Sequence, residues 1–179
     1  GRVSLANTHP FVRELWGRNW CFAHNGQLTD FQPQTGFYRP VGDTDSEAAF
    51  CELLNQVRQA FPEPVTVDVL LPELVAASTR FSQQGVFNCL LSDGDWLFSF
   101  CSTKLVCITR RAPFGPAQLK DAELTVDFTA ETTPTDVVTV IATEALTANE
   151  PWTLFAPGEW RLWRAGECVA SGVAAAISG

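Results

Sequence analysis

Two short polar blocks carry the residue types that amide chemistry needs. The first, residues 23–28, reads Ala-His-Asn-Gly-Gln-Leu, and the second, residues 42–47, reads Gly-Asp-Thr-Asp-Ser-Glu. Acyl transfer from an amide requires two hydrogen-bond donors aimed at the oxygen that becomes negative in the tetrahedral intermediate. The side-chain amide of Asn25 and the N–H of Gly26 could supply both donors from one tight turn. A plain hairpin turn is the alternative interpretation of this dipeptide.

The second block places a carboxylate at the expected start of a helix. Thr44 and Glu47 have the spacing of a capping box, in which the Thr hydroxyl accepts from the Glu N–H and the Glu side chain reaches back. Asp45 then lies in the first helical turn, which would fix it well enough to bind an α-ammonium group. The alternative is that Asp45 only complements the positive end of the helix dipole.

Other polar residues could contribute to a site, but each has an ordinary structural explanation. His9 could line a polar pocket, although a histidine before a proline is more often a loop residue, and His24 is expected to brace the turn beside it. Arg110 and Arg111 could hold a substrate carboxylate bidentately, or they could simply end a strand in solvent. Glu150 could shape a pocket wall.

The apolar pattern predicts two adjacent helices followed by a series of antiparallel strands. After the capping box, Phe50, Leu54, Val57 and Phe61 recur at helical spacing, and Pro62 ends that helix. A second helix is expected over residues 70–81 with Pro72 in its first turn, a strand over 19–23, a loop over 29–41, and further strands over 86–92, 96–102, 105–109, 124–128, 137–142, 160–163 and 168–171. This order indicates an α+β layered fold.

Composition narrows the class of protein. The net charge of −8 over 179 residues argues against nucleic-acid binding, which depends on neutralising phosphates with Lys and Arg. No apolar run reaches the roughly 18 residues that cross a bilayer, so we expect no membrane association. The six cysteines are irregularly spaced among apolar neighbours, which predicts free core thiols and a cytoplasmic location. The chain has only two histidines and no Cys-x-x-Cys pair, so no metal site is expected.

Taken in order, these motifs resemble the glutaminase domain of class II glutamine amidotransferases, most closely the small stand-alone bacterial members of the YafJ type. The resemblance runs through FVRELWGRNWCFAHNG (11–26), GVFNCLLSDG (85–94), ITRRAPFG (108–115), DVVTVIAT (136–143) and PGEWRL (157–162). It implies the four-layer αββα sandwich of N-terminal-nucleophile hydrolases. It also implies an oxyanion hole from Asn25 and Gly26, binding of the substrate α-amino group by Asp45, and a substrate-binding part for His9. The substrate would be glutamine or a γ-glutamyl small molecule, with an ammonia-accepting synthase as partner and no cofactor.

The chain departs from the family pattern at its start. The family nucleophile is a cysteine at the mature N-terminus, whereas this chain begins with Gly1. We therefore expect residues 1–171 to be the larger, C-terminal part of the domain without its N-terminal strands, residues 172–179 to be a flexible tail, and this fragment alone to be inactive. A non-catalytic ligand-binding or regulatory domain that lost the nucleophile is the alternative. An unrelated α+β domain with similar turns is a third.

Overall fold

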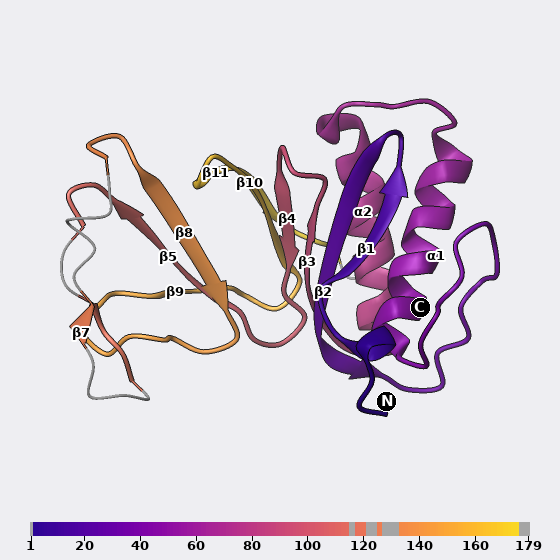
Figure 1. Ribbon diagram of the computed structural model, residues 1–179, viewed down its shortest axis with the longest axis horizontal. Coiled ribbons are helices and arrows are strands. Elements are labelled where there is room, and N and C mark those ends of the chain that lie inside the picture. The colour runs from indigo at the N-terminus through magenta and orange to yellow at the C-terminus, as the bar shows by residue number, and fades with distance from the viewer. Residues whose placement is uncertain (1, 115–116, 121–124, 127–132, 176–179) are drawn as a thin grey trace.

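The protein is described by a computed structural model that covers residues 2–114, 117–120, 125–126 and 133–175. Within these residues two α-helices pack on one side of a six-stranded sheet, here called sheet A, and a three-stranded sheet, sheet B, lies on its other side (Figure 1). Successive side chains of a strand point to opposite faces of a sheet, and Leu162 and Trp163 show this. Leu162 belongs to the core under the helices, and Trp163 belongs to the smaller core toward sheet B.

Sheet A is antiparallel throughout, in the order β1-β2-β3-β4-β10-β11. Its strands are β1 (Phe11–Leu15), β2 (Arg18–Leu28), β3 (Gly85–Ser92), β4 (Leu97–Phe100), β10 (Glu159–Arg164) and β11 (Glu167–Val173). Sheet B has the order β8-β5-β9, from β8 (Val137–Ala142), β5 (Val106–Arg111) and β9 (Thr153–Leu154). A two-stranded ribbon pairs β6 (Ala117–Gln118) with β7 (Thr125–Val126), and a short 3₁₀ helix, η1, spans Leu5–Asn7.

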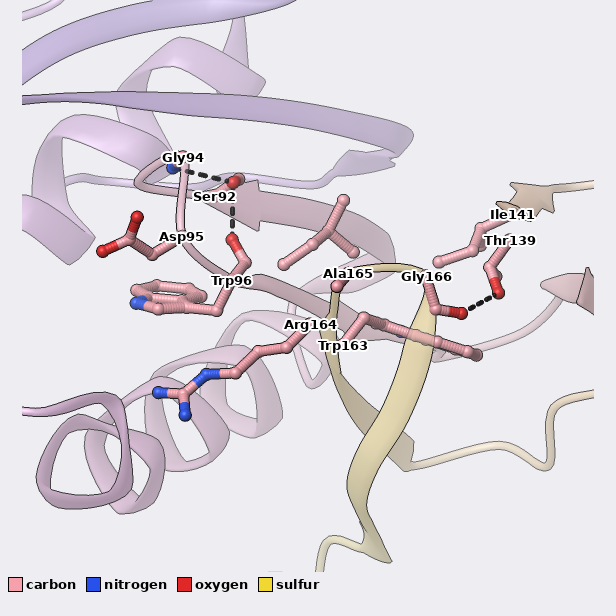
Figure 2. Close-up of a pocket in the computed structure, with 11 residues that line it drawn as sticks. Ser92, Gly94, Asp95, Trp96, Thr139, Ile141, Trp163, Arg164, Ala165 and Gly166 are labelled. Carbon is pink, nitrogen blue, oxygen red and sulfur yellow. Dashed lines mark hydrogen bonds between the residues drawn. The ribbon is translucent and has the colours of Figure 1, made fainter. Parts of the chain in front are cut away.

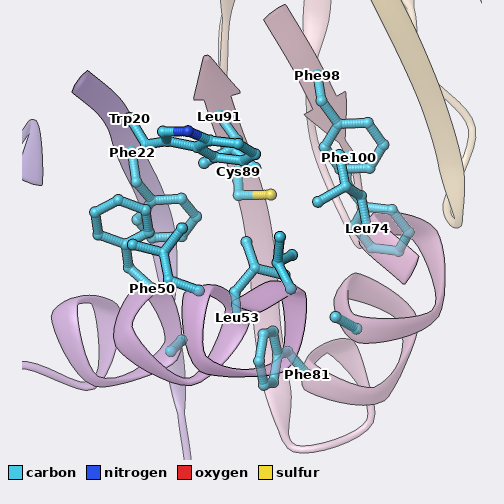
Figure 3. Packing of buried hydrophobic residues seen from close by; sticks show 14 of the residues in the cluster. Trp20, Phe22, Phe50, Leu53, Leu74, Phe81, Cys89, Leu91, Phe98 and Phe100 are labelled. Atoms are coloured by element: carbon cyan, nitrogen blue, oxygen red, sulfur yellow. The ribbon is translucent and has the colours of Figure 1, made fainter. Parts of the chain in front are cut away.

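Helix α1 (Asp45–Ala60) follows the predicted pattern and covers β1 and β2. Phe50, Leu54 and Val57 are buried on its inner face, and the Phe50 ring stacks on Phe22 of β2 at 5.1 Å between ring centroids. Figure 3 shows these aromatic side chains between the helices and the sheet. Each large side chain buried in this way contributes about 1.5–3 kcal/mol, so the packing fixes where the first turn of α1 meets the sheet.

Helix α2 (Val67–Ser82) begins earlier than predicted, and Pro72 lies inside it rather than in its first turn. The buried residues Val67, Leu70, Leu74 and Phe81 continue one helical face across the proline. Burial of that face compensates for the hydrogen bond that Pro72 cannot donate. The proline alone favours a position in the first turn, and tertiary packing of the buried face places it further inside the helix.

Most predicted strands are confirmed, with corrections at three places. The hairpin of β3 and β4, the strands β5 and β8, and the hairpin of β10 and β11 lie where the pattern placed them. β1, β6 and β9 were not predicted. The 124–128 strand is seen only as β7, since 124 and 127–128 lie outside the described residues. β11 continues through Gly172 and Val173, so the tail cannot begin at 172. Residues 176–179 also lie outside the described part.

Sheet B is an excursion of the chain between two neighbouring strands of sheet A. The chain leaves after β4 and returns at β10, and the two ends of the excursion meet. The N–H of Cys101 donates to the carbonyl of Glu159 at 2.9 Å, and the N–H of Gly158 donates to the carbonyl of Cys101 at 2.7 Å. The α+β prediction is thus confirmed. In the described residues both helices lie on sheet A, so the four-layer arrangement remains a prediction (Figure 1).

Candidate active site

Asn25 and Gly26 lie inside strand β2, not on a tight turn. β2 continues through both residues to Leu28, and β3 pairs with it so that Asn25 faces Asn88 and Gly26 faces Phe87. The turn prediction was wrong because the partner strand lies some 60 residues further along the chain. Both residues are nevertheless exposed, and in the described part of the chain the Asn25 side-chain amide makes no hydrogen bond. The two donors are therefore presented from a strand edge.

Only glycine fits at position 26. The residue has φ +149°, and a Cβ built on it would lie 1.9 Å from the Val86 carbonyl oxygen and 2.6 Å from the Val86 carbonyl carbon. Real Cβ atoms do not approach backbone this closely, so β3 would have to move away. The close contact brings the backbone of β3 directly behind the Asn25–Gly26 segment.

Asp45 is the first residue of α1, and its carboxylate reaches the same edge of β2. Thr44 caps the helix as predicted, since its hydroxyl accepts from the N–H of Glu47 at 3.2 Å. The Asp45 Oδ2 atom accepts from the N–H of Leu28 at 2.6 Å. Leu28 is two residues beyond Gly26, so their N–H groups point to the same side of the strand. Asp45 and the Gly26 N–H thus face the same space.

The reciprocal half of the predicted capping box is wrong. The Glu47 carboxylate does not bind the Thr44 N–H but accepts from the N–H groups of Val41 and Gly42, at 3.0 and 2.7 Å, and pairs with Arg13 of β1. Glu47 is 1% exposed, so its carboxylate is shielded from water, whereas the Arg13 side chain is 22% exposed. Glu47 joins β1, the loop before α1 and the helix itself, which holds Asp45 in place.

The two histidines lie close enough to Asp45 for its charge to act on both. β1 begins opposite Phe22, so the chain before it, with His9, runs along β2 toward His24. Partial burial lowers the pKa of His9, and the Asp45 carboxylate opposes this shift. Burial also lowers the pKa of His24, against the hydrogen bond to Val86 and the charge of Asp45. Both imidazoles therefore favour the neutral form near neutral pH.

His24 braces the structure, as predicted, but it does so between a strand and a helix. Its Nε2 atom lies 3.0 Å from the carbonyl of Val86, which can only accept, so Nε2 carries the proton. Nδ1 then accepts from the hydroxyl of Ser46 at 2.8 Å. His24 thereby links β3 to the residue next to Asp45, and neither ring nitrogen is left for catalysis.

Asn7 makes a contact with Asp43 that was not predicted from the sequence. Its side chain accepts from the N–H of Asp43 at 3.0 Å and donates to the Asp43 carboxylate at 2.5 Å. Donation from Asn7 to the carboxylate is the first cause of a lowered pKa at Asp43. A Cβ at Gly42 would meet the Asn7 side-chain oxygen at 2.1 Å. The segment that carries His9 is thus docked on the segment that carries Asp45, a contact between residues 36 positions apart without a local signal.

Five of the six cysteines are poorly suited to be a nucleophile. All are free; Cys51, Cys89, Cys101 and Cys107 are buried, whereas Cys21 is half-buried and Cys168 exposed, so the core prediction was wrong for these two. Burial raises the pKa of Cys89 to about 12 and also raises the pKa values of Cys51, Cys101, Cys107 and Cys168. A raised pKa disfavours the thiolate that attacks an amide.

The arginine pair belongs to a different part of the molecule. Arg110 of β5 forms a bidentate ion pair with Glu150, at 2.7 and 2.5 Å, and this hydrogen bonding lowers the pKa of Glu150. Arg111 pairs with Glu167 at 2.5 Å. Glu150 does line a cavity wall, as suggested, in a space of about 450 Å³ between sheets A and B with Arg110 and Arg161. The structure does not bring these arginines to Asn25 and Asp45.

Four further cavities among the described residues also lie away from the candidate site. Figure 2 shows one of about 230 Å³, bounded by Trp96 and Arg164 on one side and by Thr139 and Ile141 on the other. It adjoins Ser92 at the end of β3, whereas Asn25 faces Asn88, four residues earlier in that strand. Among the described residues no group of three or more His, Cys, Asp and Glu side chains could hold a metal ion. No helix there is long and apolar enough to span a membrane.

Comparisons with known proteins agree on one family. The model of the class-II glutamine amidotransferases matches residues 1–178. An Escherichia coli K12 protein named "Putative glutamine amidotransferase YafJ" is 54% identical over 171 residues, which are 94% of this chain and 67% of that protein. A Haemophilus influenzae Rd protein named "Putative glutamine amidotransferase" is 39% identical, over 95% of this chain and 58% of its own length.

Solved structures give the same family. The crystal structure of a predicted glutamine amidotransferase from Pseudomonas aeruginosa PA01 matches with a TM-score of 0.86 and 73% identity, over 93% of this chain and 66% of that one. At 12% identity and a TM-score of 0.55, the Bacillus subtilis glutamine phosphoribosylpyrophosphate amidotransferase shares the fold, over 97% of this chain and 33% of its own. The chain spans about two thirds of its E. coli and Pseudomonas relatives. It belongs to the class II glutamine amidotransferases, as a domain of the YafJ type.

Proposed function

We propose that the complete protein hydrolyses the γ-amide of glutamine or of a γ-glutamyl compound through a cysteinyl thioester. The observation that carries this proposal is the shared strand edge, where the Gly26 N–H points to the same side of β2 as the Leu28 N–H that binds Asp45. The exposed amide of Asn25 adjoins the same place. A pair of oxyanion donors and a fixed carboxylate are the two groups that a glutamine side chain and its α-ammonium require.

The spacing along β2 suits glutamine. Residues 26 and 28 are two positions apart, which corresponds to about 6.6 Å in a strand. In glutamine four bonds of about 1.5 Å separate the carboxamide carbon from the α-nitrogen, so the extended distance is about 5 Å. The carboxylate of Asp45 lies one hydrogen bond away from Leu28, at 2.6 Å. A glutamine side chain could therefore lie beside β2 with its amide oxygen at Gly26 and its ammonium group at Asp45.

In this mechanism a cysteine thiolate attacks the carboxamide carbon and forms a C–S bond, while the carbonyl electrons move to oxygen. Asn25 and the Gly26 N–H stabilise that oxyanion. Collapse of the intermediate breaks the C–N bond, the nitrogen takes a proton and ammonia leaves, and water then hydrolyses the thioester. Five cysteines have raised pKa values, and the family nucleophile is an N-terminal cysteine, so we propose a nucleophile N-terminal to Gly1, with its α-amine as base.

Further aspects of the proposal rest on family resemblance. They are the four-layer αββα sandwich for the complete domain, the absence of a cofactor, and an ammonia-accepting synthase as partner. A cytoplasmic location is proposed from the free cysteines. His9 is proposed to bind substrate, which its position near Asp45 supports. Residues 1–179 alone are proposed to be inactive. A regulatory domain that binds glutamine without turnover is the competing proposal.

The test is glutamine-dependent ammonia release by the full-length protein and by residues 1–179, with calorimetric titration of glutamine into both. We expect turnover only in the full-length protein. Asp45→Ala should raise KM more than it lowers kcat, because it removes a charged partner of the α-ammonium, and Glu63→Ala on the exposed loop after α1 is the matched control. Binding without turnover in the full-length protein would favour the regulatory alternative. An unchanged KM in Asp45→Ala would contradict the role of Asp45.

A further inference from the structure

Asn88 is a buried polar residue behind the candidate oxyanion hole. It lies in β3 directly opposite Asn25, and only 3% of its surface is exposed. Its Nδ2 atom donates to the carbonyl oxygen of Asn25 at 3.1 Å and to the hydroxyl of Thr103 at 3.0 Å. A buried amide whose hydrogen bonds are all made is a rigid anchor, because losing any of them leaves a buried polar group unpaired.

The orientation of the Asn88 amide follows from its partners. Its Oδ1 atom accepts from three successive backbone N–H groups, those of Ser102, Thr103 and Lys104, at 3.0, 3.1 and 3.2 Å. These groups can only donate, so the oxygen must face them, and the NH₂ group must face the Asn25 carbonyl. The loop after β4 thus sets the direction in which Asn88 donates.

The bond to Asn25 acts on the peptide that carries the Gly26 N–H. The Asn25 carbonyl and the Gly26 N–H belong to one peptide unit, which is planar and trans, so they point in opposite directions. Asn88 holds the carbonyl on the β3 side. The N–H is therefore directed to the opposite side, toward the edge where Asp45 binds Leu28. Donation to the carbonyl also polarises the peptide and strengthens its N–H as a donor.

We propose that Asn88 is a positioning residue that aims the Gly26 N–H at the substrate oxygen. It touches no reacting atom and works through the Asn25–Gly26 peptide. The catalytic part of this inference rests on the proposed function, whereas the effect on peptide orientation does not. The competing explanation is that Asn88 serves only to hold the loop of residues 102–104 for folding.

Asn88→Asp separates the two explanations. Aspartate keeps an oxygen for the three loop N–H groups but has no donor for the Asn25 carbonyl, and it places negative charge against that oxygen. Ser102→Ala is the matched control, since Ser102 lies in the same loop. The substitution removes the 2.7 Å bond that its hydroxyl accepts from the Phe87 N–H of β3, but it leaves the bond from Asn88 to the Asn25 carbonyl in place. In the full-length protein we expect Asn88→Asp to lower kcat roughly 10- to 100-fold with little change in KM, less than the 10²–10³ lost with a whole donor. Ser102→Ala should stay within about twofold of the wild-type kcat.

A crystal structure of the Asn88→Asp protein gives a readout that does not need activity. We expect the Asn25 carbonyl to rotate away from residue 88 while the 102–104 loop keeps its place. A wild-type kcat in Asn88→Asp, an equal loss in both variants, or an unmoved peptide would overturn the proposal. If the aspartate variant does not fold, Asn88→Ser is tested in the same way against Ser102→Ala. A wild-type protein without turnover would refute the proposed function, and the crystal structure would still decide what Asn88 does.

Discussion

Replacing Gly26 with alanine should destabilise the protein more than an ordinary glycine substitution. At φ +149° an alanine pays about 1–3 kcal/mol of backbone strain. Its Cβ would also lie 1.9 Å from the Val86 oxygen, so that carbonyl would have to retreat by about 1 Å. The carbonyl is held by His24 Nε2 at 3.0 Å, so retreat also breaks that bond. Overpacking of this kind typically costs about 1–3 kcal/mol more.

The matched control for this prediction is Gly94→Ala. Gly94 also has a positive φ, +98°, but a Cβ there would meet no atom within 4 Å. The loss of stability in Gly94→Ala therefore reflects backbone strain alone. The difference in unfolding free energy between the two variants then gives the cost of the contact with Val86. Chemical denaturation of both should show Gly26→Ala less stable by about 1–3 kcal/mol. Equal unfolding free energies, within about 0.5 kcal/mol, would refute the close approach of β3 to Gly26.

Three further outcomes test separate parts of the site. Asn25→Ala should raise the activation free energy for kcat by about 2.7–4 kcal/mol. It should leave the unfolding midpoint unchanged, since the Asn25 side chain is exposed. An unaltered kcat would show that Asn25 is not part of the oxyanion hole. Glu47→Ala should lower the unfolding free energy by about 1–3 kcal/mol, because it leaves the N–H groups of Val41 and Gly42 without their acceptor and removes the partner of Arg13, whereas a loss below about 0.5 kcal/mol would show these contacts to be unimportant. The lowered pKa of His24 means that the unfolded state binds its proton first, so stability should fall as the pH drops below about 6.5. Denaturation between pH 7 and 5.5 should show a shallower fall in His24→Asn, and parallel curves would contradict the assignment.

Local signals predicted the elements well and the site contacts poorly. The Thr44 cap and the apolar face of α1 depend on residues three or four positions apart, and both are confirmed. The Asn25–Gly26 turn was wrong because pairing with β3, a long-range interaction, overrides the turn preference of the dipeptide. Asn88 could not have been found, since a buried asparagine in a strand looks like any other polar residue until its partners are known.

Ion-pair partners and the geometry of the site also depend on contacts between residues far apart in the sequence. Arg110 reads as a free cation in the sequence, yet its partner Glu150 is 40 residues away. The placement of Asp45 near the Asn-Gly pair was anticipated from the family resemblance. What the sequence lacked was the reason for it, which is the hydrogen bond from the Leu28 backbone.

The segment that forms sheet B leaves sheet A and returns to it at nearly the same point. Because Cys101 is bonded to both Gly158 and Glu159, the chain returns to sheet A at the point where it left. Segments whose ends meet are where insertions and deletions are best tolerated, and lengthening a loop costs only about 0.6 kcal/mol per doubling. Loops between Lys104 and Phe155 could thus be lengthened or shortened without changing the register of β2 and β3. The spacing between Gly26 and Asp45 is in this way unaffected by changes of loop length in the 50 residues of the segment 105–154.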